Sequence, residues 1–158
     1  MAHTYSIGVD IGGTNTDIGL VREDGKIVAR HNIPTNKYFD IEVYLKDIVE
    51  HVKAMMKENE VETIDGIGIC APNGNTYNCT FSGATNLNFK GEFNVQEIVN
   101  KYMDVKVVVS NDANAAAFGE MIYGGGKGMK HLIMFTLGTG VGTGIIVDGK
   151  LLLGATGG

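Results

Sequence analysis

The sequence predicts an α/β fold in which helices cover both faces of a mixed β-sheet, and three observations lead to it. Three short strand-like segments open the chain, and residues 23–26 form a hairpin turn between the second and third. Helical and strand-like segments then alternate, as in a sheet whose later strands are parallel. Glycine is about twice as frequent as usual, with 23 residues in 158, and its clusters mark backbone that turns tightly or approaches a ligand.

The individual elements follow from periodicity and from end signals. Short runs of apolar and β-branched residues predict strands at 5–9, 17–22, 26–33, 66–71 and 105–109. Apolar residues at helical spacing predict helices that begin after Asp40 and at 94–103 and 112–123, the last rich in alanine. The resulting order βββαβαβα is typical of a ribonuclease H-like domain.

The end of the chain repeats the pattern of its beginning. Residues 131–137 and 141–147 read as two strands joined by a glycine turn, with Asp148-Gly149 as the next turn. We therefore predict two domains: residues 1–125 form the first, and residues 126–158 begin a second, truncated copy. The apolar faces of strands 131–153 would then lack partners, so we expect them to be exposed and to favour self-association.

Composition and charge exclude several classes of protein. The net charge is −5, and basic residues form no stripe that could bind a nucleic-acid backbone. No signal peptide and no apolar stretch near the roughly 20 residues of a membrane span is present. Cys70 and Cys79 have no metal-binding spacing and suggest no disulfide framework. These features favour a cytoplasmic protein without nucleic-acid or membrane partners.

The first candidate site follows the first strand. It consists of a carboxylate, a two-glycine turn and small polar side chains, namely Asp10, Gly12, Gly13, Thr14 and Asn15. Glycines expose backbone N–H groups to a phosphate, hydroxyl groups donate further hydrogen bonds, and Asp10 can bind Mg²⁺ through water. We favour this interpretation over a simple polar hairpin loop.

A second glycine turn, with Gly138, Thr139 and Gly140, joins the last two long strands. It is not a dinucleotide-binding fingerprint because no helix follows it, and no Walker A motif is present. Alone this turn is a weak signal. A nucleotide bound between two similar domains, however, needs a phosphate-binding turn from each.

The third candidate is Ser110-Asn111-Asp112-Ala113-Asn114, where the alanine-rich helix begins. Helix capping explains these residues, with Ser110 or Asn111 as the N-cap and Asp112 in the first turn. A carboxylate in that position also stays ionised, so it could accept a hydroxyl proton during phosphoryl transfer. Taken alone, the motif leaves both interpretations open.

Taken together in this order, the three segments resemble the ROK family of bacterial sugar kinases, a branch of the actin-like ATPase fold. The resemblance covers the whole chain and rests on Asp10-Ile11-Gly12-Gly13-Thr14, Asn111-Asp112-Ala113-Asn114 and Leu137-Gly138-Thr139-Gly140-Val141-Gly142. It implies ATP and Mg²⁺ as cofactors, both glycine loops as phosphate sites and Asp112 as general base. It also implies a sugar pocket formed by Gly74, Asn86, Asn111 and Asp112.

The activity that this resemblance implies is transfer of the γ-phosphate of ATP to the 6-hydroxyl of a hexose, with glucose as the first candidate. N-acetylmannosamine, N-acetylglucosamine, fructose, mannose and allose stay open, as does polyphosphate as donor. Two other classes are a sugar-responsive transcriptional regulator, for whose winged helix the chain has no room before residue 5, and an ATP-gated chaperone or filament protein.

Two family segments are expected beyond Gly158: a Gly-Glu-x-Gly-His motif that binds the sugar and a cysteine-rich loop that binds structural Zn²⁺. We therefore expect the 158-residue chain to fold but to phosphorylate poorly or not at all. The resemblance further implies that the full-length protein is a homodimer or homotetramer.

Overall fold

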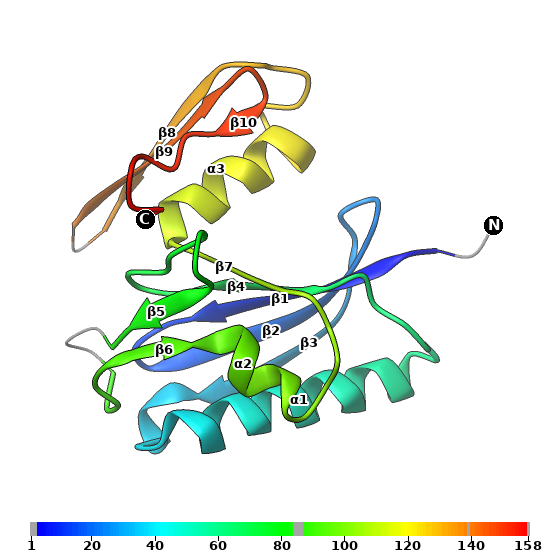
Figure 1. Cartoon of the computed structure of the whole chain (residues 1–158). Helices are drawn as coiled ribbons and strands as arrows, with labels where there is room; N and C mark the ends of the chain where they lie inside the picture. The colour runs from blue at the N-terminus through cyan, green and yellow to red at the C-terminus, as the bar shows by residue number, and fades with distance from the viewer. Residues whose placement is uncertain (1–2, 84–86, 139, 158) are drawn as a thin grey trace.

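The structure, a computed structural model, describes residues 3–83, 87–138 and 140–157. It confirms the predicted α/β class, with a five-stranded sheet in the order β3-β2-β1-β4-β7 (Figure 1). These strands are β1 (Tyr5–Ile11), β2 (Asn15–Arg22), β3 (Ile27–Pro34), β4 (Ile67–Cys70) and β7 (Val107–Ser110). The first three are antiparallel to one another, whereas β4 pairs in parallel with both β1 and β7.

Helices α1 (Ile41–Glu58) and α2 (Val95–Asn100) lie on one face of this sheet (Figure 1). Asp40 caps α1 as predicted, because its carboxylate accepts a hydrogen bond of 2.9 Å from the amide of Val43. The core-facing side of α1 is fully apolar apart from one tyrosine hydroxyl and consists of Tyr44, Leu45, Ile48, Val49, Val52, Met55 and Met56. These side chains pack on the alternate residues Ile7, Val9 and Ile11 of β1, which are equally buried.

The opposite face of the sheet corrects the expectation of helices on both sides. Gly8, Gly68 and Val108, which lie side by side on β1, β4 and β7, are exposed. Helix α3 (Asp112–Tyr123) packs on strands β8 (Leu132–Leu137) and β9 (Val141–Val147).

Close packing between α3 and β9 depends on residues without large side chains. A Cβ atom added to Gly144 would lie 2.4 Å from the carbonyl oxygen of Ala113 and 2.5 Å from the Cβ of Ala117. Gly142 similarly lies beside Ala113 and Thr136. The alanines of α3 and the glycines of β9 therefore let helix and hairpin approach more closely than ordinary side chains would allow. By packing, α3 belongs with the strands that follow it, and the domain boundary after residue 125 stays a prediction.

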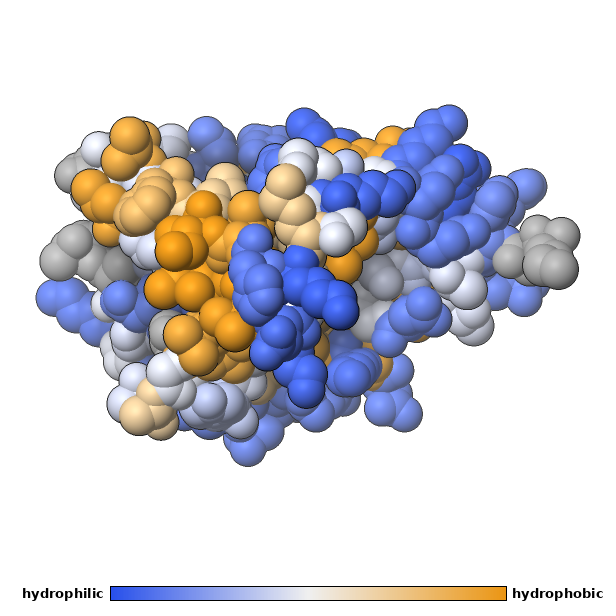
Figure 2. Space-filling model, turned by 90° about the horizontal axis from the view of Figure 1, so that it is seen from above, coloured by the Kyte–Doolittle hydropathy of each residue, from blue (hydrophilic) through white to orange (hydrophobic). Residues whose placement is uncertain are grey.

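The outer face of the small sheet β10-β9-β8 is apolar and exposed, as the sequence predicted, where β10 is Lys150–Leu151. Figure 2 views the molecule from this side and shows a continuous hydrophobic patch. Its exposed side chains are Ile133, Phe135, Leu137, Val141, Val147 and Leu152. The turn at Asp148-Gly149 is also confirmed, since both residues have positive φ. The helices of the described residues are too short or too polar to span a membrane.

Four elements were not predicted: the 3₁₀ turn η1 (Thr35–Lys37), the strand β10, and the strands β5 (Thr80–Ser82) and β6 (Glu92–Asn94), which form a small hairpin. Helix α2 is also shorter than predicted. The side-chain amide of Asn100 donates to the carbonyl oxygens of Met103 and Val105, at 3.0 and 2.8 Å, so the chain turns there towards β7.

Candidate active site

The carboxyl ends of three adjacent parallel strands place the candidate site. The β1–β4 register pairs Asp10 with Cys70, and the β4–β7 register pairs Cys70 with Ser110. Paired residues of neighbouring strands point to the same face of a sheet. Asp10 and Cys70 therefore emerge side by side on the face opposite α1, and the chain continues from Ser110 directly into α3.

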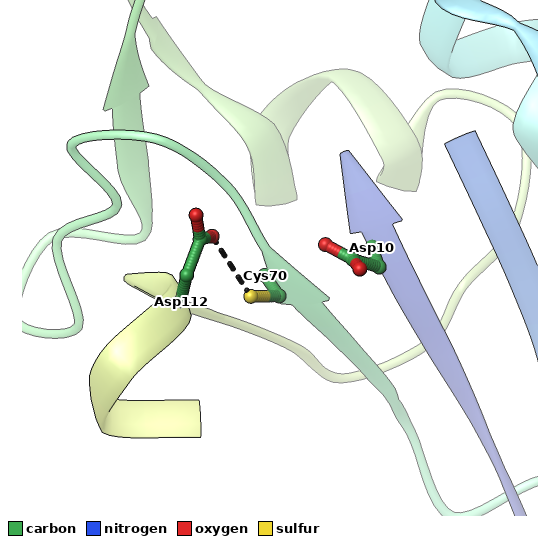
Figure 3. Close-up of side chains that lie close together, drawn as sticks. All are labelled: Asp10, Cys70 and Asp112. Atoms are coloured by element: carbon green, nitrogen blue, oxygen red, sulfur yellow. Dashed lines mark hydrogen bonds between the residues drawn. The ribbon is translucent and has the colours of Figure 1, made fainter. Parts of the chain in front are cut away.

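Asp112 lies in the first turn of α3, on the other side of Cys70 from Asp10 (Figure 3). Asn111 is the N-cap, because its Oδ1 accepts a hydrogen bond of 2.8 Å from the amide of Asn114. The thiol of Cys70 donates to Oδ1 of Asp112 over 3.1 Å. Capping and catalysis are thus compatible here: Asn111 caps the helix, and Asp112 stays accessible to solvent.

The electrostatics of the site are dominated by negative charge. Partial burial, followed by the nearby carboxylates of Asp112 and Asp17, raises the pKa of Asp10 above its usual value. Burial, followed by the hydrogen bond to Asp112, raises the pKa of the Cys70 thiol. The thiol is therefore protonated and serves as a donor rather than as a nucleophile.

These side chains suit a divalent cation. One ligand atom from each of Asp10, Cys70 and Asp112 lies within 4.8 Å of the others. Among the described residues, no lysine, arginine or histidine forms an ion pair with Asp10 or Asp112. Mg²⁺ prefers oxygen ligands, so Asp10 and Asp112 fit it and the thiol does not.

The first glycine loop is a tight hairpin turn between β1 and β2. The amide of Gly12 donates to the carbonyl oxygen of Asn15 at 3.0 Å, so this N–H is already used within the turn. A Cβ on Gly12 would lie 2.8 Å from the same oxygen. Of the predicted phosphate-binding residues, Gly12 therefore shapes the loop, whereas the side chains of Thr14 and Asn15 are exposed.

A network of buried hydroxyl groups supports this loop, and no sequence pattern indicated it. Thr16, which follows the turn, lies 2.7 Å from Thr35 and 2.5 Å from the hydroxyl of Tyr44, oxygen to oxygen. The amide of Thr35 also donates to the carbonyl oxygen of Thr14. Burial raises the pKa of Tyr44 to about 12, so its hydroxyl keeps its proton. Helix α1 and the turn after β3 thereby fix the position of the loop.

The second glycine loop and the start of α3 border one open groove of about 510 Å³. Its lining comprises Pro72, Asn73, Asn111, Asp112, Ala113, Thr136, Leu137, Gly138, Gly140, Val141, Gly142 and Thr143. The structure therefore brings Asn111 and Asp112 together with Gly138 and Gly140. Asp10 and the first glycine loop are not part of this lining, and Thr139 lies outside the described residues.

The remaining predicted pocket residues differ in position. Gly74 is buried, and a Cβ there would lie 2.3 Å from the carbonyl oxygen of Ser110, so the backbone packs closely at this position. Its place in a sugar pocket stays a prediction. Asn86 lies outside the described residues. Two residues that the sequence did not indicate bind residues 154–156 by hydrogen bonds. The side-chain amide of Asn75 donates to the carbonyl oxygen of Thr156, and the hydroxyl of Tyr77 donates to the carbonyl oxygen of Gly154.

The chain is similar to known proteins over nearly its whole length. The sequence model of the ROK family matches residues 6–158. A glucokinase of Streptomyces coelicolor is 41% identical over 149 residues, which cover 94% of this chain and 45% of that protein. An N-acetylmannosamine kinase of Vibrio cholerae is 30% identical over 152 residues, or 96% of this chain and 51% of that protein.

Among solved structures, a ROK family glucokinase from Streptomyces griseus in complex with glucose and AMPPNP matches with a TM-score of 0.75 and 35% identity. The match covers 97% of this chain and 47% of that one. The likeness confirms the predicted actin-like ATPase class of fold. The chain thus spans about half the length of the relatives that it matches.

Proposed function

The chain belongs to the ROK family, and from that premise we propose that it is the N-terminal half of an ATP-dependent sugar kinase. The proposed reaction transfers the γ-phosphate of ATP to the 6-hydroxyl of a hexose, with glucose as the preferred substrate. Similarity to the glucokinase of Streptomyces coelicolor supports glucose. Similarity to an N-acetylmannosamine kinase keeps that sugar as the main alternative.

One observation carries the proposal: Asp112 borders the groove that also contains Gly138 and Gly140, while Cys70 lies between it and Asp10. A kinase needs a base at the acceptor hydroxyl and a cation near the phosphates, a few ångströms apart. Asp112 and Asp10 provide carboxylates at such a separation. Their elements, α3 and β1, are fixed by packing and by strand register.

In this mechanism Asp112 accepts the proton of the sugar hydroxyl as the hydroxyl oxygen attacks the γ-phosphorus. General-base assistance of this kind typically contributes about 10²- to 10⁴-fold in rate. The Cys70 thiol positions the carboxylate by donating to Oδ1, which leaves Oδ2 for the substrate. Gly138 and Gly140, whose Cα atoms have no neighbour within reach of a Cβ, leave space for phosphate oxygens against the backbone.

Asp10 would bind Mg²⁺, directly or through water, with Asp112 nearby. When bound, Mg²⁺ neutralises charge that develops on the transferred phosphoryl group. Partial burial, and after it the carboxylates of Asp112 and Asp17, raise the pKa of Asp10, and a bound divalent cation would favour the ionised form again. We propose that the 158-residue chain alone phosphorylates poorly, because the groove is open and the protein's relatives are about twice as long.

The decisive test is an ADP-release assay on the longer protein that contains this chain, with glucose, mannose, fructose, N-acetylglucosamine and N-acetylmannosamine as acceptors. Asp112→Asn should lower kcat by about 10²-fold or more and leave the fold unchanged. Asp104→Asn, an exposed aspartate outside the site, is the matched control. The 158-residue chain is assayed in parallel.

A sugar-dependent rate that Asp112→Asn abolishes and Asp104→Asn preserves would support the kinase and identify its acceptor. ATP turnover that ignores every sugar would favour a chaperone or filament protein of the same fold. Sugar binding without turnover would instead favour a transcriptional regulator.

A further inference from the structure

A pair of histidines lies on the side of the molecule that the proposed kinase reaction does not use. His31 belongs to β3, one of the two edge strands of the five-stranded sheet, and His51 belongs to α1. Although they are 20 residues apart, their Nδ1 atoms are only 2.9 Å from each other. Their rings are nearly perpendicular, with an interplanar angle of 87° and centroids 5.1 Å apart.

The outer nitrogen of each ring faces a carboxylate. Nε2 of His31 is 3.8 Å from Oε2 of Glu58, and Nε2 of His51 is 4.0 Å from Oδ2 of Asp47. Asp47 is itself fixed, because the hydroxyl of Tyr38 donates to it. Lys37 is the cation near this group, with Nζ 4.0 Å from Asp47.

This arrangement suits a cation that is bound by the Nδ1 atoms of both rings. A carboxylate favours an N–H on the nitrogen that faces it. If both Nε2 atoms carry their hydrogen, both Nδ1 atoms present lone pairs to each other at 2.9 Å. Two facing lone pairs repel each other unless the nitrogens share a proton, as in the hydrogen bond that a separation of 2.9 Å allows, or bind one metal ion that lies to the side of the line joining them.

We propose that His31 and His51 form a binding site for a divalent transition-metal ion, Ni²⁺ or Cu²⁺, coordinated by their two Nδ1 atoms. Metal-bound histidines usually donate their other ring N–H to a carboxylate. Glu58 and Asp47 are the carboxylates nearest to these nitrogens, at 3.8 and 4.0 Å, and would have to approach by about 1 Å to accept such hydrogen bonds. The side chains of His31 and His51 are 26% and 33% exposed, so a hydrated ion can reach them and retain water as its remaining ligands.

The nitrogen separation selects the metal. With metal–nitrogen bonds of about 2.0–2.1 Å, two nitrogens 2.9 Å apart subtend an angle of about 90° at the ion. Adjacent positions of square-planar or octahedral coordination have this angle, which suits Cu²⁺ and Ni²⁺ better than tetrahedral Zn²⁺. Small rotations of the two rings would bring both lone pairs onto the ion. Such an ion would link the edge strand to α1.

The test uses the 158-residue chain and needs neither ATP nor sugar, so its result is independent of the proposed kinase activity. A free N-terminal amine with a histidine at position 3 is itself a ligand set for Cu²⁺ and Ni²⁺. All proteins therefore carry His3→Gln. Ni²⁺ binding is measured by isothermal titration calorimetry, and nitrogen ligands of bound Cu²⁺ are counted by electron paramagnetic resonance.

We expect one site, two imidazole nitrogens on Cu²⁺, and a loss of Ni²⁺ affinity of at least about tenfold in either His31→Gln or His51→Gln. His131→Gln is the matched control, since His131 also lies beside a carboxylate, Asp148, at 3.6 Å. This control should bind as tightly as its parent. Circular dichroism checks that each variant is folded.

Equal Ni²⁺ affinity in His31→Gln and its parent would overturn the proposal. So would a loss in His131→Gln as large as that in His51→Gln, or a single imidazole nitrogen on Cu²⁺.

Discussion

Two regions of the molecule differ in how far their apolar side chains are buried. The first region is the five-stranded sheet with α1 and α2, and the second is the small sheet β8–β10 with α3. In the first region Leu45 of α1 and Ile18 of β2 are fully buried within a continuous apolar core. In the second region Ile133, Phe135 and Leu137 of β8 are 59, 63 and 82% exposed. Alternating apolar residues in a strand therefore determine which face of the sheet is apolar. That face is buried only where another element packs on it.

The means of packing differ as well. The first region fills its interior with large aliphatic and aromatic side chains, which is the usual way to stabilise a domain. The second region joins α3 to β9 through glycine and alanine, which brings the two backbones together with few large side chains between them. We expect the free energy of unfolding to reside mainly in the first region.

Matched leucines give the largest expected contrast. Leu45→Ala removes a fully buried side chain and should destabilise the chain by about 2–5 kcal/mol. Leu137→Ala, at a position 82% exposed, should change stability by less than about 0.5 kcal/mol. Urea unfolding monitored by circular dichroism measures both. Similar losses for the two variants would mean that the β8 face is covered in solution.

Two glycine variants test the packing of α3. Gly144→Ala forces a Cβ against Ala113 and Ala117 and should cost about 1–3 kcal/mol. Gly119 lies in α3 itself and has free space around it. Gly119→Ala should therefore stabilise the chain by about 0.5–1 kcal/mol. Thermal unfolding of both proteins provides the comparison. A neutral Gly144→Ala would show that α3 and β9 are less closely packed than described.

The bare face of the second region should promote self-association of the 158-residue chain. Phe135→Ser should weaken this association by roughly tenfold, since burial of a phenylalanine contributes about 1.5–3 kcal/mol. Phe39→Ser is the control, because Phe39 is 76% exposed but lies in the first region. Sedimentation velocity over a range of concentrations measures the change. An equal effect of both substitutions would show that self-association does not depend on the apolar face of β8.

The smallest expected effect concerns Asp10, whose ionised carboxylate lowers the stability of the first region. Because the pKa of Asp10 is raised, its ionised form is less favourable in the folded than in the unfolded chain. Asp10→Asn should therefore stabilise the chain near pH 7, by at most about 1 kcal/mol after solvent screening.

This gain should shrink as the pH falls through the raised pKa towards the usual value for aspartate, where wild-type Asp10 becomes protonated. Urea unfolding of the wild-type and Asp10→Asn proteins at several pH values measures this gain in stability. A gain that grew on acidification would contradict the direction of the shift.

Local sequence patterns predicted most elements, because alternation and helical spacing directly reflect a buried face. They failed where no period exists. The three-residue strands β5 and β6 are separated by nine residues and carry no such signal. The end of α2 depends on side-chain hydrogen bonds of Asn100, which propensity does not encode.

The site was predictable to the extent that its residues belong to motifs. Asp10, Asn111 and Asp112 were identified from their neighbours in sequence, and the structure places them near one another. Cys70 was missed as a site residue because nothing adjacent to it marks it, and only strand pairing brings it between two carboxylates. The Thr16, Thr35 and Tyr44 network was missed for the same reason, since it joins β2, η1 and α1.

The in-register alignment of Asp10, Cys70 and Ser110 across three strands makes the site unequally tolerant of insertions and deletions. Loops between the strands can change length without moving these residues, because hydrogen-bond pairing fixes them. A single residue added within β4 would instead turn Cys70 towards α1 and bring an apolar neighbour to face Asp112. Insertions and deletions in descendants of this sequence should accordingly occur between the strands and be rare within the last four residues of each strand.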